Sequence, residues 1–204
     1  MTRRRATPVA IALAAIAAAG CGGSDAGETV ARAAPAGTHA AAERAPTRRP
    51  RAVLADCSSR SMADFPDAFV APGNLVAGPL VIVRGGYTAP DAIREYGGDK
   101  IPVLVAPGHR VTLQLTRPAH RVVALAYGPL PQGEIGHRDA HRAVTFEACR
   151  PGKESGSTAG GSEVTFWMGF ILAREPACAP LYAWIDDEPV PRRLMLRMGV
   201  RRCE

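Results

Sequence analysis

The fold is predicted by one short stretch, residues 111–115, which reads VTLQL. In an extended chain Val111, Leu113 and Leu115 point to one side, and Thr112 and Gln114 point to the other. A period of two is typical of a strand with one buried and one polar face. We therefore begin from this strand and look for its repeats along the chain.

Further apolar runs, broken by Gly and Pro, extend from about Val53 to Glu204. They lie at 75–83, 101–105, 123–127, 143–148, 164–172, 181–185 and 194–200. In the run at 164–172, VTFWMGFIL, one face would carry Val164, Phe166, Met168, Phe170 and Leu172. These runs predict an all-β domain, an immunoglobulin-like antiparallel β-sandwich of about eight strands with one short helix.

The short helix is expected after Thr88-Ala89-Pro90-Asp91, which has the form of a capping box. Gly97 would end it, because glycine readily adopts the left-handed conformation found after helix ends. Residues 151–162, PGKESGSTAGGS, are rich in Gly and Ser and predict a mobile loop.

The first 20 residues have the pattern of an export signal. Arg3, Arg4 and Arg5 precede an apolar run, residues 9–19, which is shorter than the roughly 20 residues that a spanning helix needs. The stretch Ala18-Ala19-Gly20-Cys21 resembles the lipobox of bacterial lipoproteins. This resemblance implies that Cys21 carries a lipid and anchors the exported protein to the outer face of the cytoplasmic membrane. The alternative is ordinary secretion, with Cys21 lost or left as a free thiol.

The chain has five cysteines, an odd number. If Cys21 carries lipid, Cys57, Cys149, Cys178 and Cys203 remain, and an even set is typical of disulfides in an oxidising compartment. Four cysteines allow three pairings. We favour Cys149 with Cys178, which would close the Gly/Ser-rich excursion. Cys57 with Cys203 would then tie the two ends of the domain together.

Residues 22–52 contain Ala, Pro, Gly, Thr and Arg but scarcely any large apolar side chain, which predicts a disordered linker. The expected organisation is a signal peptide at 1–20, an anchor cysteine and linker at 21–52, and a domain at 53–204. The formal net charge of +6 comes largely from arginines of the signal and the linker. The folded part is nearly neutral, so nucleic acid is not an expected partner.

No established catalytic or cofactor-binding motif occurs in the sequence, including a nucleophile elbow, a phosphate loop and HExxH. We therefore expect a protein that is not an enzyme and has no cofactor. His137 and His141 are candidate metal ligands, to which Met168, Met195 and Met198 would add soft ligands for copper. The alternative is that these histidines are solvated and the methionines fill gaps in the core.

Two faces of the predicted strands are candidate binding surfaces. Trp167, Tyr182 and Trp184 are expected to share an outer face, on which planar rings would stack against wall glycan; the alternative is that they pack structurally. Arg193, Arg197 and Arg201 form a row on the last predicted strand. Guanidinium groups bind phosphate or carboxylate polymers bidentately, but such a row also protects an edge strand from aggregation.

Several stretches together resemble a group of uncharacterised secreted proteins and lipoproteins of actinobacterial type. They are GNLVAGPLVIV (73–83), TFEAC (145–149), WMGF (167–170), ACAPLYAWID (177–186) and GVRRC (199–203). This resemblance implies a four-cysteine β-sandwich and carries over no catalytic residue. We therefore expect a lipid-anchored envelope module that binds a wall polymer or an envelope protein. The alternatives are a copper- or zinc-binding lipoprotein and a wall-modifying enzyme.

Overall fold

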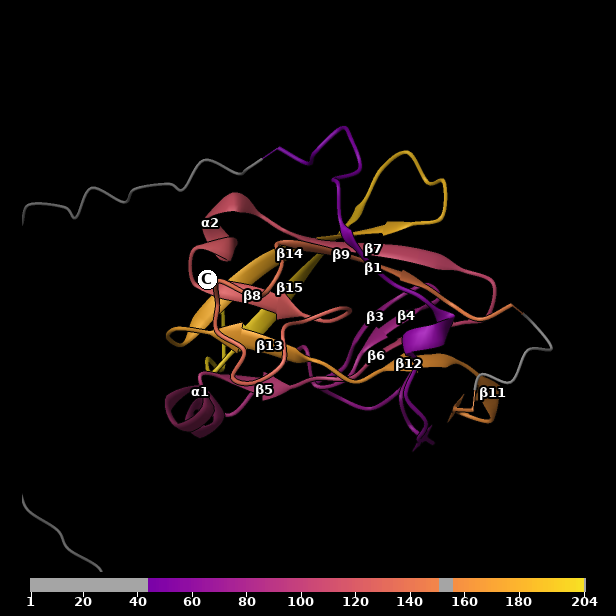
Figure 1. Cartoon of the computed structure of the whole chain (residues 1–204), viewed down its shortest axis with the longest axis horizontal. Coiled ribbons are helices and arrows are strands. Elements are labelled where there is room, and N and C mark those ends of the chain that lie inside the picture. The colour runs from indigo at the N-terminus through magenta and orange to yellow at the C-terminus, as the bar shows by residue number, and fades with distance from the viewer. Residues whose placement is uncertain (1–43, 151–155, 204) are drawn as a thin grey trace, which may run out of the picture. The chain divides into compact units, whose positions relative to one another are not determined.

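The computed structural model describes residues 44–150 and 156–203 (Figure 1). These residues form fifteen strands, several of them only two or three residues long, and two short α-helices. Neither of these helices is long and apolar enough to cross a bilayer. The predicted signal peptide, Cys21 and the first part of the linker lie outside the described residues.

The largest sheet has five strands in the order β1-β9-β7-β14-β15. All its pairings are antiparallel except that of β1 with β9, which is parallel. The core face predicted for residues 111–115 is confirmed, because Val111, Leu113 and Leu115 are fully buried in the main core. The other face is not exposed as expected, since Thr112 and Gln114 are buried as well. The strands are β1 (Val53–Ala55), β7 (Arg110–Leu115), β9 (Ala143–Glu147), β14 (Ala177–Ile185) and β15 (Arg192–Met198).

Two smaller sheets form the other side of the main core (Figure 1). One has the order β12-β6-β4-β3, with β3 (Leu75–Ala77), β4 (Leu80–Ile82), β6 (Val103–Val105) and β12 (Thr165–Trp167). The other has the order β5-β13-β8, with β5 (Gly98–Lys100), β8 (Val123–Ala126) and β13 (Phe170–Ala173). This arrangement confirms the predicted all-β, sandwich-like class, although with more and shorter strands than expected.

Strands β4 and β6 are buried on both faces, which explains their unbroken apolar sequences. Leu80 and Ile82 of β4 lie in the main core. Val81 of the same strand and Leu104 of β6 lie in a second, smaller cluster with Val164.

The run at 164–172 is not one strand. It breaks between β12 and β13 at Gly169, where an added Cβ would lie 2.7 Å from the Ala126 carbonyl oxygen and overlap the ring of Tyr127. The alternation predicted across this run is therefore lost. Trp167 is packed in the main core, whereas Phe170 is 41% exposed.

Helix α1 (Pro90–Tyr96) is the predicted helix, and it ends as expected at Gly97, which has φ of 66°. The predicted capping box is wrong, because the N-cap is Ala89, which makes no side-chain cap. Thr88 instead is buried beside the sulfur of Met198. A second helix, α2 (Arg117–His120), was not predicted, and its N-cap Thr116 accepts a hydrogen bond from the Ala119 amide.

The described part of the Gly/Ser-rich segment contains a small hairpin, not only a loop. Strands β10 (Thr158–Ala159) and β11 (Ser162–Glu163) are joined by Gly160 and Gly161, both with positive φ. Such a pair suits a two-residue hairpin turn. Strand β2 (Asp64–Phe65) pairs with β10 and completes a third small sheet.

Both favoured disulfide pairings are wrong. The structure has Cys57–Cys149 and Cys178–Cys203. Ala55 of β1 pairs with Phe146 of β9 in a parallel ladder, so the two chain segments continue next to each other in the same direction. This brings Cys57 close to Cys149. After β15 the chain turns at Gly199, which has φ of 70°, so that Cys203 reaches Cys178 on the neighbouring β14.

Candidate functional site

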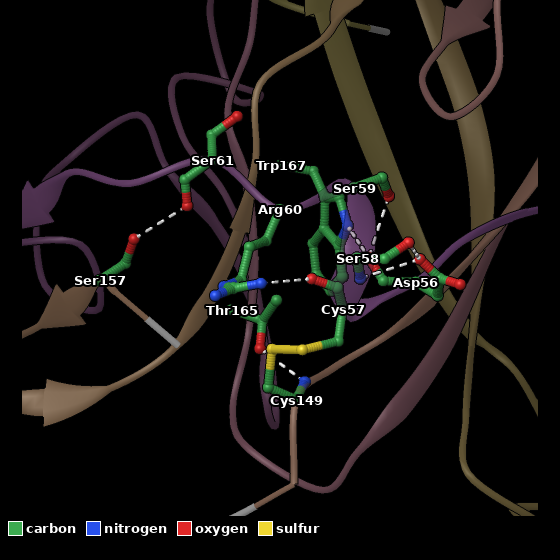
Figure 2. Close-up of a disulfide and its surroundings, with 10 residues drawn as sticks. All are labelled: Asp56, Cys57, Ser58, Ser59, Arg60, Ser61, Cys149, Ser157, Thr165 and Trp167. Atoms are coloured by element: carbon green, nitrogen blue, oxygen red, sulfur yellow. Dashed lines mark hydrogen bonds between the residues drawn. A yellow bond between two sulfur atoms is a disulfide. The ribbon is translucent and has the colours of Figure 1, made fainter. Parts of the chain in front are cut away.

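A hollow of about 400 Å³ lies beside the Cys57–Cys149 disulfide. Its lining includes Asp56, Ser58, Glu147 and Arg150. The Asp56 carboxylate accepts hydrogen bonds from the Ser58 hydroxyl (2.6 Å) and the Ser58 amide (3.0 Å) (Figure 2). These bonds, above all that from the hydroxyl, lower the pKa of Asp56 and keep its negative charge at the hollow.

The short 3₁₀ turn η1 (Cys57–Ser59) that carries this carboxylate is held from several sides. The Trp167 indole N–H donates to the Asp56 carbonyl oxygen (2.9 Å), and Arg60 donates to the Cys57 carbonyl oxygen (3.0 Å). On the other half of the disulfide, the Cys149 amide donates to the Thr165 hydroxyl (2.8 Å) (Figure 2). The disulfide and these bonds hold the wall of the hollow in place.

A second hollow, of about 330 Å³, shares Glu147, Ala148 and Arg150 with the first. His109 and Asp186 also line it, with 2.7 Å between His109 Nδ1 and Asp186 Oδ2. The other oxygen of Asp186 accepts a hydrogen bond from the Arg110 amide (2.8 Å). Burial alone would raise the pKa of Asp186, but the bonds from Arg110 and His109 hold it below its ordinary value.

We call the two adjoining hollows the end groove and define it by Asp56, Ser58, His109, Glu147, Arg150, Asp186 and Asp187. Arg110 forms an ion pair with Glu147 where the hollows meet. Arg150 and Asp187 have no ion-pair partner among the described residues. Since His109 Nδ1 faces a carboxylate, Nε2 is the acceptor nitrogen of the neutral ring. The groove therefore offers the cations Arg49 and Arg150, several carboxylates and an imidazole.

The aromatic face predicted from Trp167, Tyr182 and Trp184 is wrong. Tyr182 and Trp184 do point away from Leu181 and Ile185, but each is only 3% exposed. Trp184 donates its indole N–H to Gln114 on the neighbouring β7 (3.1 Å). Trp167 belongs to a different sheet and packs against Phe146 in the core. The three rings therefore do not form a surface on which a sugar could stack.

The arginine row is also not formed as predicted. Arg193 is exposed on β15, which is an edge strand of the five-stranded sheet. Arg197 instead donates to the carbonyl oxygens of Gly86 and Arg201, so it braces the backbone. Arg201 follows the turn at Gly199 and lies beyond the end of β15.

The two predicted metal ligands do not join a larger ligand group. Among the described residues, no three His, Cys, Asp or Glu side chains are placed to hold a metal ion. His137 stacks on His120, with 5.6 Å between ring centroids, and its Nδ1 lies 3.5 Å from Arg174. Met198 is fully buried in the core.

Sequence reasoning missed His109 and Asp186 as partners. They are 77 positions apart, and neither belongs to a motif. The antiparallel pairing of Val111 with Ile185 brings their segments together at one end of the sheet. The sequence contained one indication of a charged turn: Asp186 and Asp187 directly follow a predicted strand.

Comparison of the chain with family models, curated proteins and solved structures gives no match. The functional argument therefore rests on the chemistry of this chain.

Proposed function

We propose that this protein is an exported, lipid-anchored module of the cell envelope that binds a ligand in the end groove. The observation that carries this proposal is the pair of adjoining hollows at the disulfide-held end of the five-stranded sheet. Two disulfides are compatible with an oxidising, extracellular location. The lipobox resemblance at Cys21 supports the membrane anchor.

A binding role is favoured over covalent catalysis by what surrounds His109. The described residues that line its hollow include no hydroxyl, thiol or lysine amine that the imidazole could activate as a nucleophile. The Asp186 carboxylate instead holds the ring in place. The groove is thus equipped to recognise charge and hydrogen bonds.

The charges of the groove favour a ligand that carries both signs. Arg150 would pair with a carboxylate, and Asp187 would pair with an amine. The peptide part of a bacterial wall, or an exposed segment of an envelope protein, has this chemistry. A purely neutral glycan is less well matched, because the three rings proposed for stacking are buried.

The test is retention of the full chain, solubilised from native membranes, on purified cell wall. We expect Arg150→Glu to weaken retention several-fold and the remaining binding to fall with added salt, because partly exposed charges are screened. Arg193→Glu is the matched control, since it makes the same change on an exposed part of β15 outside the groove. Equal loss of retention in both variants would refute the groove as the binding site.

A further inference from the structure

A third hollow, of about 370 Å³, lies beside helix α1. Its volume falls in the range of small-ligand pockets, which is about 300–1,000 Å³. Its polar side chains are Arg94, Arg174, His137 and Tyr96, and no carboxylate is among the described residues that line it. This hollow, which we call the α1 pocket, shares no lining residue with the end groove.

The positive charge of Arg174 is not balanced within the pocket. Its guanidinium lies 3.5 Å from His137 Nδ1 and forms no ion pair with any described residue. The ring of His120 stacks on that of His137, with 5.6 Å between centroids. Arg174 therefore places a positive charge, unpaired among the described residues, at the pocket, and this charge attracts an anion.

Three carboxylates lie next to the pocket, and each is bonded to a residue of its lining. Asp91 pairs with Arg94, and Asp139 accepts a hydrogen bond from the Gly136 amide (2.9 Å). Glu95 accepts a hydrogen bond from the Tyr96 hydroxyl (2.6 Å). None of these acidic groups lines the pocket.

The rest of the lining is apolar. Ile93 and Ala173 are almost completely buried, and Leu172 and Ile135 are half-buried. A ligand here would therefore meet a cationic edge and an aliphatic floor. Neither inorganic phosphate nor a neutral alkane matches both parts.

We propose that the α1 pocket binds a small amphipathic carboxylate. Its headgroup pairs with the Arg174 guanidinium and its aliphatic body lies on Ile93 and Leu172. The Arg fork suits a carboxylate bidentately, and removal of the aliphatic body from water favours binding. This site is independent of the ligand proposed for the end groove.

The state of His137 agrees with this proposal. Burial lowers its pKa, and Arg174 and His120 lower it further. A bound anion would oppose the effect of the Arg174 charge. The pKa of His137 is therefore expected to rise when the pocket is filled, which gives a readout at the site itself.

The experiment measures binding of hexanoate to the full chain by calorimetry and by NMR titration of the His137 ring. Hexanol, hexyl phosphate and inorganic phosphate are the comparison probes. We expect hexanoate to bind at least about tenfold more tightly than hexanol or inorganic phosphate and to raise the pKa of His137. Arg174→Gln should weaken hexanoate binding about tenfold, whereas Arg193→Gln, on an exposed part of β15, should not.

Three results would overturn the proposal. Equal binding of hexanol and hexanoate would remove the role of charge. Binding of hexyl phosphate without binding of hexanoate would assign the pocket to another headgroup. Unchanged hexanoate binding in Arg174→Gln, with a native circular dichroism spectrum, would exclude the guanidinium as the partner.

Discussion

Asp186 combines a rare backbone conformation with three contacts. Its φ of 41° lies in the left-handed region, where Asp and Asn are more frequent than other non-glycine residues. Its amide donates to the Arg110 carbonyl oxygen (2.8 Å), and its carboxylate bonds both the Arg110 amide and His109. One residue thus joins the end of β14 to the start of β7 and positions the imidazole of the end groove.

Asp186→Asn should make the free energy of unfolding depend less on pH in the acid range. The folded-state pKa of Asp186 lies below its ordinary value of 3.8, so the ionised form favours the folded state. This contribution is complete above the unfolded pKa and is lost as pH falls through the folded pKa. The variant should therefore be less stable than wild type near neutral pH, and the difference should shrink as the pH falls below the ordinary value of 3.8 and through the lower folded-state pKa.

The measurement is urea unfolding of both proteins across this pH range. Asparagine tolerates the positive φ, so the substitution tests the charge with little change of backbone preference. Asp187→Asn is the control, because Asp187 forms no ion pair among the described residues. A pH profile of Asp186→Asn that parallels wild type would contradict the role of the carboxylate.

Gly169 is required by close packing and not by backbone conformation. Gly169→Ala should lower the free energy of unfolding by about 1–3 kcal/mol or more, because the new methyl group meets the Tyr127 ring and the Ala126 carbonyl oxygen. Tyr127 cannot easily move, since it is buried and donates to the Ile101 carbonyl oxygen (2.6 Å). Gly136→Ala, where the nearest atom is the Asp139 carboxylate at 3.4 Å, should change stability far less. Equal effects in urea unfolding would be inconsistent with this packing.

The disulfides follow the pairing of strands. Cys57–Cys149 extends the only parallel pair of the five-stranded sheet, and Cys178–Cys203 ties the chain end to β14. Each bridge therefore connects segments that hydrogen bonding has already brought together. The first bridge also forms part of the wall of the end groove.

Removal of Cys57–Cys149 should be the more destabilising change. Its two cysteines are 92 positions apart and those of Cys178–Cys203 are 25 apart. The chain-entropy relation gives about 4–5 kcal/mol for the longer loop and about 3–4 kcal/mol for the shorter one. Paired Cys→Ser variants, compared by urea unfolding, test this order.

Peptide mapping without reduction tests the connectivity itself. The expected fragments join Cys57 to Cys149 and Cys178 to Cys203. A fragment that joins Cys149 to Cys178 would contradict the strand pairing described here.

The two proposed recognition sites lie in separate parts of the described domain. Helix α1, beside its pocket, lies on the opposite side of the view from the turn between β14 and β15, where the end groove is built (Figure 1). A module with two separate sites could hold a small carboxylate and a wall peptide together. The lipid anchor proposed at Cys21 would keep both sites near the membrane.

Cys21→Ser should move the protein from the membrane fraction to the soluble exported fraction, because the hydroxyl does not accept the thioether-linked lipid.

Intact mass spectrometry of the wild-type protein from native membranes should show the acyl groups and a start at Cys21. Reduction should then add the mass of four hydrogens, two for each disulfide.

Arg48→Ala is a control for the linker, since it leaves the anchor cysteine unchanged and should stay in the membrane fraction. Recovery of unacylated wild-type protein from cells with an intact lipidation pathway would refute the anchor.

Local patterns in the sequence account for the all-β class, the buried face of β7, and the helix that ends at Gly97. The reason is geometric: a strand alternates its side chains with a period of two, and glycine reaches the left-handed conformation without steric penalty. Such patterns do not show whether the second face of a strand is covered. For that reason Trp184 looked like a surface residue, although it is buried and bonded to Gln114.

Only the assembled sheets determine which distant segments of the chain come into contact. Both disulfides, the inward position of Trp167 and the meeting of His109 with Asp186 depend on which strands pair and in which register. Many pairings of similar apolar strands satisfy the same alternation, so residue order does not choose among them. Packing of the common core makes that choice, and it places the end groove and the α1 pocket where they are.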